Sequence, residues 1–505
     1  MTKLNNKRLT TLNAIASLLL QVATIISSFV IPRLTLKVFG SEVNGLVSSL
    51  NQFLHYVTIL EGGVSAVIMA NLYKPLLSKD SAKISSIVVA TKKFFKTLAL
   101  IFAGYALLVA LFYQPIMNTS FSYQFIFSLT LILAVTIFIQ YNFSLTWRLL
   151  LQADKKVYIA AFVQILFILI NTASFALAIN IWPNIHILKL ISAAFFVLQP
   201  IAYNYFVKKY FKLDLSIKPN KNLLKSRWDG FSINIAAFVH HNTDITLLTM
   251  FTSLKTVSVY AVYNLVTSGL RKIIQSVSSG ILPSLGHVYA EGDEKKLLST
   301  IYHYEYVIFF LVTMFFTVGG LLITPFVQLY TTNVTDTNYY QPIFGLLLVL
   351  SEAVYCLRDP FVNLAYSANK FKEIKFHAYF EAILNIGISI ILVAVFRLGL
   401  IGVAIGTLSA MTYRTIFHII YTRKLLPTYT YKHFFKVLSI FLITATISVL
   451  MACLAPIGNT TILSWIGHAI IYSGITLLLL LINSRLFLKD EFNYLFGSLV
   501  KKFKR

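Results

Sequence analysis

Apolar windows of about 20 residues, each long enough to cross the hydrocarbon core of a bilayer as a helix, recur along the whole chain. Short polar breaks separate these windows, and we count fourteen of them. Only 12% of the 505 residues are charged, whereas an ordinary soluble domain has roughly 25%. So few charges cannot cover a surface that faces water, so the composition excludes a soluble globule. The sequence predicts an all-α polytopic membrane protein.

The predicted spans set the framework for every later assignment. They cover residues 12–36, 44–70, 94–114, 123–146, 157–181, 187–207, 229–252, 257–282, 304–327, 341–364, 376–396, 400–421, 434–455 and 462–486.

The distribution of basic residues predicts how the chain is oriented. Lys and Arg outnumber Asp and Glu by 43 to 18, which gives a net charge of +25. With the amino terminus placed in the cytoplasm, most of the basic residues fall in inner loops and tails. The outer segments then hold only Arg33, Lys37, Lys189, Lys255 and Arg397. This positive-inside asymmetry predicts a multi-pass protein of the cytoplasmic membrane with both termini in the cytoplasm. The basicity thus indicates topology and contact with membrane lipids, not nucleic-acid binding.

The sequence motifs do not indicate an enzyme. The two cysteines, Cys356 and Cys453, both fall inside predicted spans, so neither a disulfide framework nor a metal-ligand cluster is expected. The sequence contains no P-loop, no H-E-x-x-H and no G-x-S-x-G. We expect a protein that is not an enzyme, without cofactor or metal. An H⁺ or Na⁺ gradient or the membrane potential would drive it.

The spans divide into two groups of six and a final pair. We predict an N-terminal six-helix lobe over 1–207, a basic cytoplasmic linker over 208–227, a C-terminal six-helix lobe over 228–424, and two appended helices with a basic tail over 425–505. At an offset near 215 residues, the turn Val38–Asn44 overlays the turn Thr252–Ser258. Parallel halves of this kind are typical of transporters that alternate access to a central site. The alternative, that any polytopic chain can be cut into sixes, stays open.

Polar residues inside the spans fall on helical faces. In the first span, Asn13, Ser17, Gln21, Thr24 and Ser28 follow one another at steps of three or four residues, which places them on one face. The eighth span repeats this pattern with Asn264, Ser268, Arg271, Gln275 and Ser278. Such faces predict a hydrated central cavity, although single Ser, Thr and Asn residues also serve as contacts between helices.

Charges within apolar spans are costly, so they are candidates for function. Guanidinium groups match paired phosphate oxygens, so deep arginines favour an anionic substrate such as a lipid pyrophosphate. The candidate headgroup residues are Arg33, Lys37, Arg271, Arg358 and Arg414, and Lys272 is a further core cation. The candidates for ion coupling or gating are Glu61, His241, Asp244, Glu352, Asp359 and Glu381. Permanent ion pairs are the alternative role for Glu61, Glu381 and Arg414.

Several motifs resemble one transporter family. They include Val38-Phe-Gly-Ser-Glu-Val-Asn-Gly45, Leu60-Glu-Gly-Gly-Val64, Leu72-Tyr-Lys-Pro75, Trp228-Asp-Gly230, Thr243-Asp244, Val257-Ser-Val-Tyr260, and the stretch from Asn385 through Arg397-Leu-Gly-Leu to Thr407 and Tyr413-Arg414. Over essentially the whole chain, the sequence resembles the multidrug/oligosaccharidyl-lipid/polysaccharide exporter superfamily, in its Wzx-type polysaccharide flippase branch.

This resemblance implies a V-shaped bundle with a central cationic cavity and a portal between the first and eighth spans. It implies that Arg33 and Arg271 meet the pyrophosphate of a lipid-linked glycan while the lipid tail stays in the membrane. We therefore expect a flippase for an undecaprenyl-pyrophosphate-linked oligosaccharide. It would act as a monomer, with a polysaccharide polymerase and glycosyltransferases as its partners. The rivals are an ion-coupled exporter of small amphipathic drugs and a membrane glycosyltransferase or polymerase.

Overall fold

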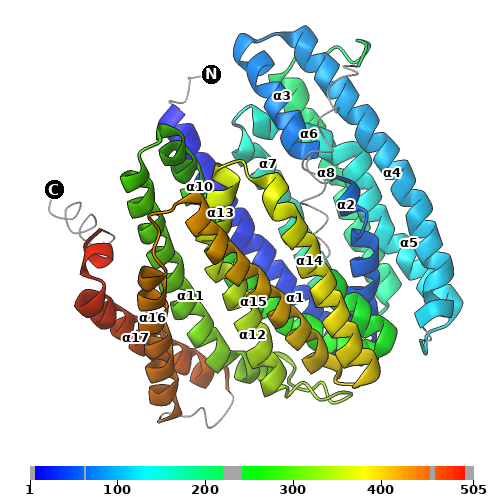
Figure 1. Cartoon of the computed structure of the whole chain (residues 1–505). Coiled ribbons are helices and arrows are strands. Elements are labelled where there is room, and N and C mark those ends of the chain that lie inside the picture. Colours follow the sequence, from blue (N-terminus) through cyan, green and yellow to red (C-terminus); the bar gives the residue numbers. More distant parts are fainter. Residues whose placement is uncertain (1–5, 62–63, 118, 220–241, 455–460, 495–505) are drawn as a thin grey trace. The chain divides into compact units, whose positions relative to one another are not determined.

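The chain folds almost entirely into long helices (Figure 1). The structure is a computed structural model, and it describes residues 6–61, 64–117, 119–219, 242–454 and 461–494. Within these ranges there are helices and no strands. Ten of the helices are long and apolar enough to cross a membrane. The predicted all-α polytopic fold is confirmed.

The chain separates into two compact units. Unit 1 comprises Met1–Phe238 together with Ser253–Ser258, and unit 2 comprises Val239–Thr252 and Val259–Arg505. The short segment Ser253–Ser258 therefore belongs to the unit that precedes it in the chain. Each unit is described separately below.

Unit 1 contains eight α-helices and a π-helical turn in its described residues. They are α1 (Asn6–His55), α2 (Thr58–Glu61), α3 (Val64–Ser78), α4 (Ser81–Met117), α5 (Tyr123–Ile139), η1 (Gln140–Ser144), α6 (Leu145–Ala153), α7 (Val157–Ile181) and α8 (Ile185–Tyr210).

Unit 2 begins with a helix over residues 242–251. The others are α10 (Leu254–Glu291), whose first residues lie in unit 1, α11 (Glu294–Tyr330), α12 (Pro342–Leu357), α13 (Asp359–Ser367), α14 (Phe371–Ile390), η2 (Ile391–Val395), α15 (Gly399–Leu425), α16 (Tyr431–Cys453) and α17 (Ile462–Phe487).

Ten long helices correspond to fourteen apolar windows for several reasons. The window 229–252 lies partly outside the described residues, and α10, which covers the window 257–282, is not among the ten. The first two windows run together in α1, which is kinked at Gly40, where φ is 78°. A glycine adopts this left-handed φ without steric cost. The tenth window is split between α12 and α13 at Arg358, next to Pro360. Proline is favoured in the first turn of a helix, so it marks the start of α13.

The surfaces of both units are apolar, as expected of helices that face lipid. On α4, Leu100, Ile101 and Leu108 are more than half exposed, whereas Phe95 and Phe102 of the same helix are fully buried. Buried polar groups are frequent, and Ser49, Asn385 and Thr444 have no exposed surface. Apolar residues on the outside and polar residues inside fit a helix bundle that is surrounded by the bilayer.

The two helices that follow the second group of six both pack on α11 of unit 2. Both α16 and α17 contact α11 and each other (Figure 1). Val318 and Leu322 of α11 form a buried apolar cluster with Ala452 of α16 and Tyr472 of α17. Trp465 of α17 donates a hydrogen bond from its indole nitrogen to the carbonyl of Leu322 at 3.3 Å. Phe361 of α13 adds ring contacts with Tyr429 and Phe434, so α11 and α13 both hold the described parts of 425–505.

The two turns that the sequence comparison overlays touch each other within unit 1. Asn44 donates a hydrogen bond from Nδ2 to Oγ of Ser258 at 2.8 Å, across 214 residues of sequence. At Gly45, a Cβ atom would overlap the backbone carbonyl of Leu254. Small residues permit this kind of backbone approach between membrane helices.

Candidate functional site

A buried carboxylate, Asp244, lies at the centre of a hydrogen-bonded cluster in unit 2. The helix over 242–251 carries it, and only 5% of the residue is exposed. The Tyr260 hydroxyl donates to Oδ2 at 2.9 Å, and the Thr407 hydroxyl lies 3.1 Å from the same oxygen and 3.3 Å from Oδ1. Asn385 connects to the cluster through a 3.0 Å hydrogen bond from Nδ2 to Thr407 Oγ1.

The Asp244 cluster joins four helices. Asp244 comes from the helix over 242–251, Tyr260 from α10, Asn385 from α14 and Thr407 from α15. Gly406 allows α14 and α15 to meet here, because a Cβ at that position would overlap the Ser389 hydroxyl. No ion pair to Asp244 occurs among the residues that the structure describes. The carboxylate is therefore held by hydroxyl groups, which also suit a proton or a small cation.

Two cations of unit 2 that the sequence singles out are engaged with acids close by. Arg271 of α10 donates to Glu352 Oε1 of α12 at 2.6 Å, and the exposed fractions of the two side chains are 17% and 11%. The guanidinium of Arg358 donates to Glu381 Oε1 at 3.0 Å and lies 4.2 Å from the centre of the Tyr355 ring.

Glu381 also binds a second arginine. Arg414 Nη1 lies 3.3 Å from Glu381 Oε2, and Arg414 Nε donates to Nε2 of the fully buried His418 at 2.8 Å. Glu381 therefore lies between two guanidinium groups. The alternative of permanent ion pairing, left open for Glu381 and Arg414, describes their contacts in this structure.

Unit 1 contains a polar cavity of about 330 Å³ whose lining has a cation and no acid. Thr24 and Ser28, from the polar face predicted on the first span, lie at one side, and Lys189 of α8 lies at another. The full lining comprises Thr24, Ser27, Ser28, Ile31, Pro32, Thr35, Asn44, Val47, Ser48, Asn51, Ile168 and Lys189.

Several hydroxyl groups in the lining of this cavity donate to carbonyl groups of their own helices. Thr24 donates to the carbonyl of Leu20 at 2.8 Å, and Thr35 donates to that of Ile31 at 2.9 Å. Ser48 donates to the carbonyl of Asn44 at 2.8 Å. Because the hydroxyl protons bond to their own helix, the oxygens remain available as acceptors. The cavity thus combines neutral acceptors with one ammonium group, a combination suited to a polyhydroxylated, anionic ligand.

The other residues singled out by the sequence are dispersed. In unit 1, Arg33 is half-buried on α1, Lys37 is exposed, and Glu61 accepts hydrogen bonds from Ser65 at 2.9 Å and Tyr141 at 3.1 Å. In unit 2, Lys272 is exposed and Asp359 is half-buried in the first turn of α13. His241 lies outside the described residues. The roles assigned to all of these residues stay predictions.

The sequence places Lys189 at the edge of the predicted span 187–207, and the positive-inside count groups it with the outer segments. In the structure it belongs to α8 and lines the polar cavity, because α8 begins at Ile185. A second cation, Arg148, was counted with an inner loop, yet it lines a pocket of about 200 Å³ with Gln140, Gln164 and Gln199. The two pockets share Ile168 in their linings. The predicted span 187–207 already includes Lys189, and an extension of the span 123–146 by one turn would have included Arg148.

Comparisons with solved structures identify the class of fold. The lipid II flippase MurJ, in an inward closed conformation, aligns with a TM-score of 0.70 and 18% identity, over 95% of this chain and 99% of that chain. An inward-facing multidrug resistance MATE family transporter of the MOP superfamily aligns with a TM-score of 0.61 and 15% identity, over 80% and 94%. The eukaryotic MATE transporter AtDTX14 aligns with a TM-score of 0.59 and 13% identity, over 86% and 99%. No protein-family profile and no curated protein sequence matches the chain.

These similarities define a polytopic membrane-transporter fold. More particularly, it is the fold that the MurJ flippase shares with MATE transporters, one of which is described as a member of the MOP superfamily.

Proposed function

We propose that this protein is a flippase of the Wzx-type branch. It moves an undecaprenyl-pyrophosphate-linked oligosaccharide from the inner to the outer leaflet of the cytoplasmic membrane for assembly of a cell-surface polysaccharide. The observation that carries this proposal is the polar cavity of unit 1, which has hydroxyl and amide groups and Lys189 in its lining. A sugar headgroup needs a hydrated path through the bilayer, and acceptor oxygens can bind its hydroxyls.

Charge also favours an anionic substrate over a cationic drug. The arginines Arg271, Arg358 and Arg414 are paired with acids, whereas the unit 1 cavity has Lys189 and no acid in its lining. A cationic drug would be repelled there. Arg33 and Lys37, on the same helix as much of the lining, are proposed to add contacts to the pyrophosphate.

Asp244 is the proposed coupling residue. Its carboxylate is buried among hydroxyl and amide groups from four helices, so loading it with H⁺ or Na⁺ would change how those helices pack. Entry of the ion, or the membrane potential, would then bias the two lobes between inward and outward access. A polysaccharide polymerase would consume the product at the outer leaflet.

The proposed function is tested by depleting the protein and measuring the pool of lipid-linked glycan in extracted lipids by mass spectrometry. Accessibility of the glycan in each leaflet is probed separately with an impermeant reagent. We expect a complete repeat unit to accumulate in the inner leaflet. An unchanged pool, together with greater sensitivity to cationic dyes, would instead favour the exporter of amphipathic drugs, which the MATE-like fold also accommodates. A truncated glycan would favour an enzyme.

The coupling role is tested by Asp244→Asn, which keeps the size of the side chain and removes its charge. We expect glycan export in reconstituted vesicles to lose its dependence on pH or Na⁺, and the rate to fall at least about tenfold. Asp336→Asn, a change at an exposed loop acid, is the matched control. Normal export by Asp244→Asn across a series of pH and Na⁺ concentrations would remove Asp244 from the coupling role.

A further inference from the structure

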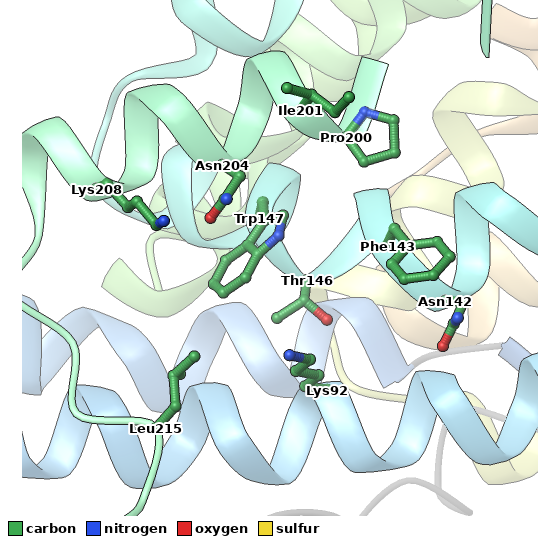
Figure 2. Close-up of a pocket in the computed structure, with 10 residues that line it drawn as sticks. All are labelled: Lys92, Asn142, Phe143, Thr146, Trp147, Pro200, Ile201, Asn204, Lys208 and Leu215. Carbon is green, nitrogen blue, oxygen red and sulfur yellow. The ribbon is translucent and has the colours of Figure 1, made fainter. Parts of the chain in front are cut away.

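A groove of about 400 Å³ lies on unit 1, apart from the polar cavity described above. Figure 2 shows Lys92 of α4 and Lys208 of α8 extending toward the region of Thr146, Trp147 and Asn204. The lining is completed by Asn142, Phe143, Pro200, Ile201 and Leu215. Four elements and the segment after α8 thus contribute to one site.

The backbone is irregular where the groove forms. The π-helix η1 follows α5 directly, and it turns Tyr141 inward, where the residue is 3% exposed and bonded to Glu61. Asn142 and Phe143, the next two residues, line the groove. Insertions of this kind within helices occur often at functional sites. On the facing helix, α8, Pro200 lines the groove and lacks a backbone N–H.

The chain segment after α8 closes one side of the groove. The backbone N–H of Asp214 donates to Ser85 Oγ at 3.0 Å, and Ser86 Oγ donates to the carbonyl of Lys218 at 2.9 Å. These bonds hold the segment on α4 and place Leu215 in the lining. The Asp214 carboxylate accepts bonds from the hydroxyl and amide of Ser216, and these bonds lower its pKa. It is therefore charged and bonded within its own segment.

Hydrogen-bond donors are concentrated in the groove without partners. Within the described residues, the side chains of Lys92, Lys208, Asn142, Asn204 and Trp147 have no hydrogen bond or ion pair, and no acid lines the groove. Two ammonium groups, two amides and an indole N–H all remain able to donate. Charged and polar donors that converge in this way favour an anion with several oxygens.

Apolar side chains border the same donors. Phe143, Ile201 and Leu215 have exposed fractions of 49%, 63% and 46%. Trp147 has the amphipathic character of residues at the membrane interface. The ligand therefore combines an anionic oxygen-rich group with an apolar portion, which is the chemistry of a phospholipid.

We propose that this groove binds the headgroup phosphate of an anionic glycerophospholipid, with its acyl chains against Phe143 and Ile201. Single ammonium groups act as point charges and suit a phosphodiester, whereas the forked guanidinium that matches paired phosphates is absent from the lining. Lys92 and Lys208 belong to the face that the positive-inside pattern assigns to the cytoplasm, where anionic lipids attract basic residues. The bound lipid would tie α4, α6 and α8 together.

The test uses the full-length protein with Trp147 as its only tryptophan, after Trp182→Phe, Trp228→Phe and Trp465→Phe. It is placed in nanodiscs of phosphatidylcholine that contain a low fraction of phosphatidylglycerol with brominated acyl chains, which quench tryptophan on contact. We expect brominated phosphatidylglycerol to quench Trp147 more strongly than brominated phosphatidylcholine at the same fraction. Equal quenching by the two lipids would overturn the proposal.

Matched charge variants show whether the groove itself is responsible for the binding of phosphatidylglycerol. Lys92→Gln with Lys208→Gln should weaken phosphatidylglycerol binding at least about tenfold. Lys93→Gln with Lys209→Gln, which removes the same charges from exposed neighbours on the same helices, should leave binding unchanged. Equal losses in both pairs would mean that the attraction is nonspecific, and would overturn the proposal.

Two further measurements complete the test. Native mass spectrometry of retained lipid, on proteins with all four tryptophans, repeats the comparison without relying on the single-tryptophan variant. Undecaprenyl diphosphate is then added as a competitor. If it displaces phosphatidylglycerol at lower concentration, and only when Lys92 and Lys208 are present, the groove binds a polyprenyl diphosphate and the phospholipid assignment is wrong.

Discussion

At the scale of single residues, the buried arginines of unit 2 are matched to acids. Arg271 pairs with Glu352, and Glu381 lies between Arg358 and Arg414. A buried ion pair contributes little net stability, because desolvation offsets the attraction, but removal of one partner is costly. These pairs therefore keep charge inside the helix bundle at a tolerable cost.

The pair of Arg271 and Glu352 permits a sharp test of the headgroup role assigned to Arg271. Arg271→Met leaves a buried carboxylate without its cation and should destabilise the protein by about 3–5 kcal/mol. Arg271→Met with Glu352→Gln should recover most of this loss, measured as thermal unfolding in detergent. We expect glycan export to be abolished in both the single and the double variant. Recovered export would mean that Arg271 serves only to neutralise Glu352.

At the scale of helices, close backbone approach shapes the bundle. Gly40 kinks α1, and Gly45, a few residues further, lies against the carbonyl of Leu254. The adjacent bond from Asn44 to Ser258 fixes the same contact. The start of α10 is therefore held by the first kinked helix, and Ser253–Ser258 groups with unit 1 for this reason.

This contact predicts different effects for two glycine substitutions. Gly45→Ala places a methyl group against backbone atoms that cannot rotate away, and should lower the free energy of unfolding by about 1–3 kcal/mol. Gly104→Ala on α4 meets no atom within 4 Å, and should be neutral or stabilising because alanine favours helix. Thermal unfolding of the two variants measures the difference. Equal stability of both would show that α1 and α10 do not approach closely at Gly45.

At the scale of the whole molecule, the basic residues of the loops predict the orientation in the membrane. Helix α11 has an exposed lysine, Lys295, near its first residue, and a predicted outer loop follows its last. The positive-inside pattern places these two ends on opposite sides of the membrane. The chain has only two cysteines, so labelling with thiol reagents can decide the orientation with few background changes.

We predict that Lys295→Cys is protected and Thr335→Cys is labelled when intact cells are treated with an impermeant thiol reagent. Positions 295 and 335 are both exposed, and each substitution is made in a protein that already carries Cys356→Ala and Cys453→Ala. After membrane permeabilisation, both should react. The reverse pattern in intact cells would invert the orientation and place both termini outside.

The sequence by itself determined which segments form the helices of the bundle. Apolar windows, the kink at Gly40 and the break before Pro360 are local features, because helix formation depends on residues a few positions apart. Asp244 was identified in the same way, since a charge inside an apolar window is unusual wherever the window packs.

Only the tertiary structure decided which side chains meet. Glu381 could have faced a substrate, and its position between Arg358 and Arg414 depends on how α13, α14 and α15 pack. Lys92 and Lys208 are separated by more than 100 residues yet line one groove, and Lys189, at the edge of its predicted span, lines a cavity. Hydropathy is a sum over neighbours in sequence, whereas ion pairs and cavities depend on distances across helices, which no local pattern encodes.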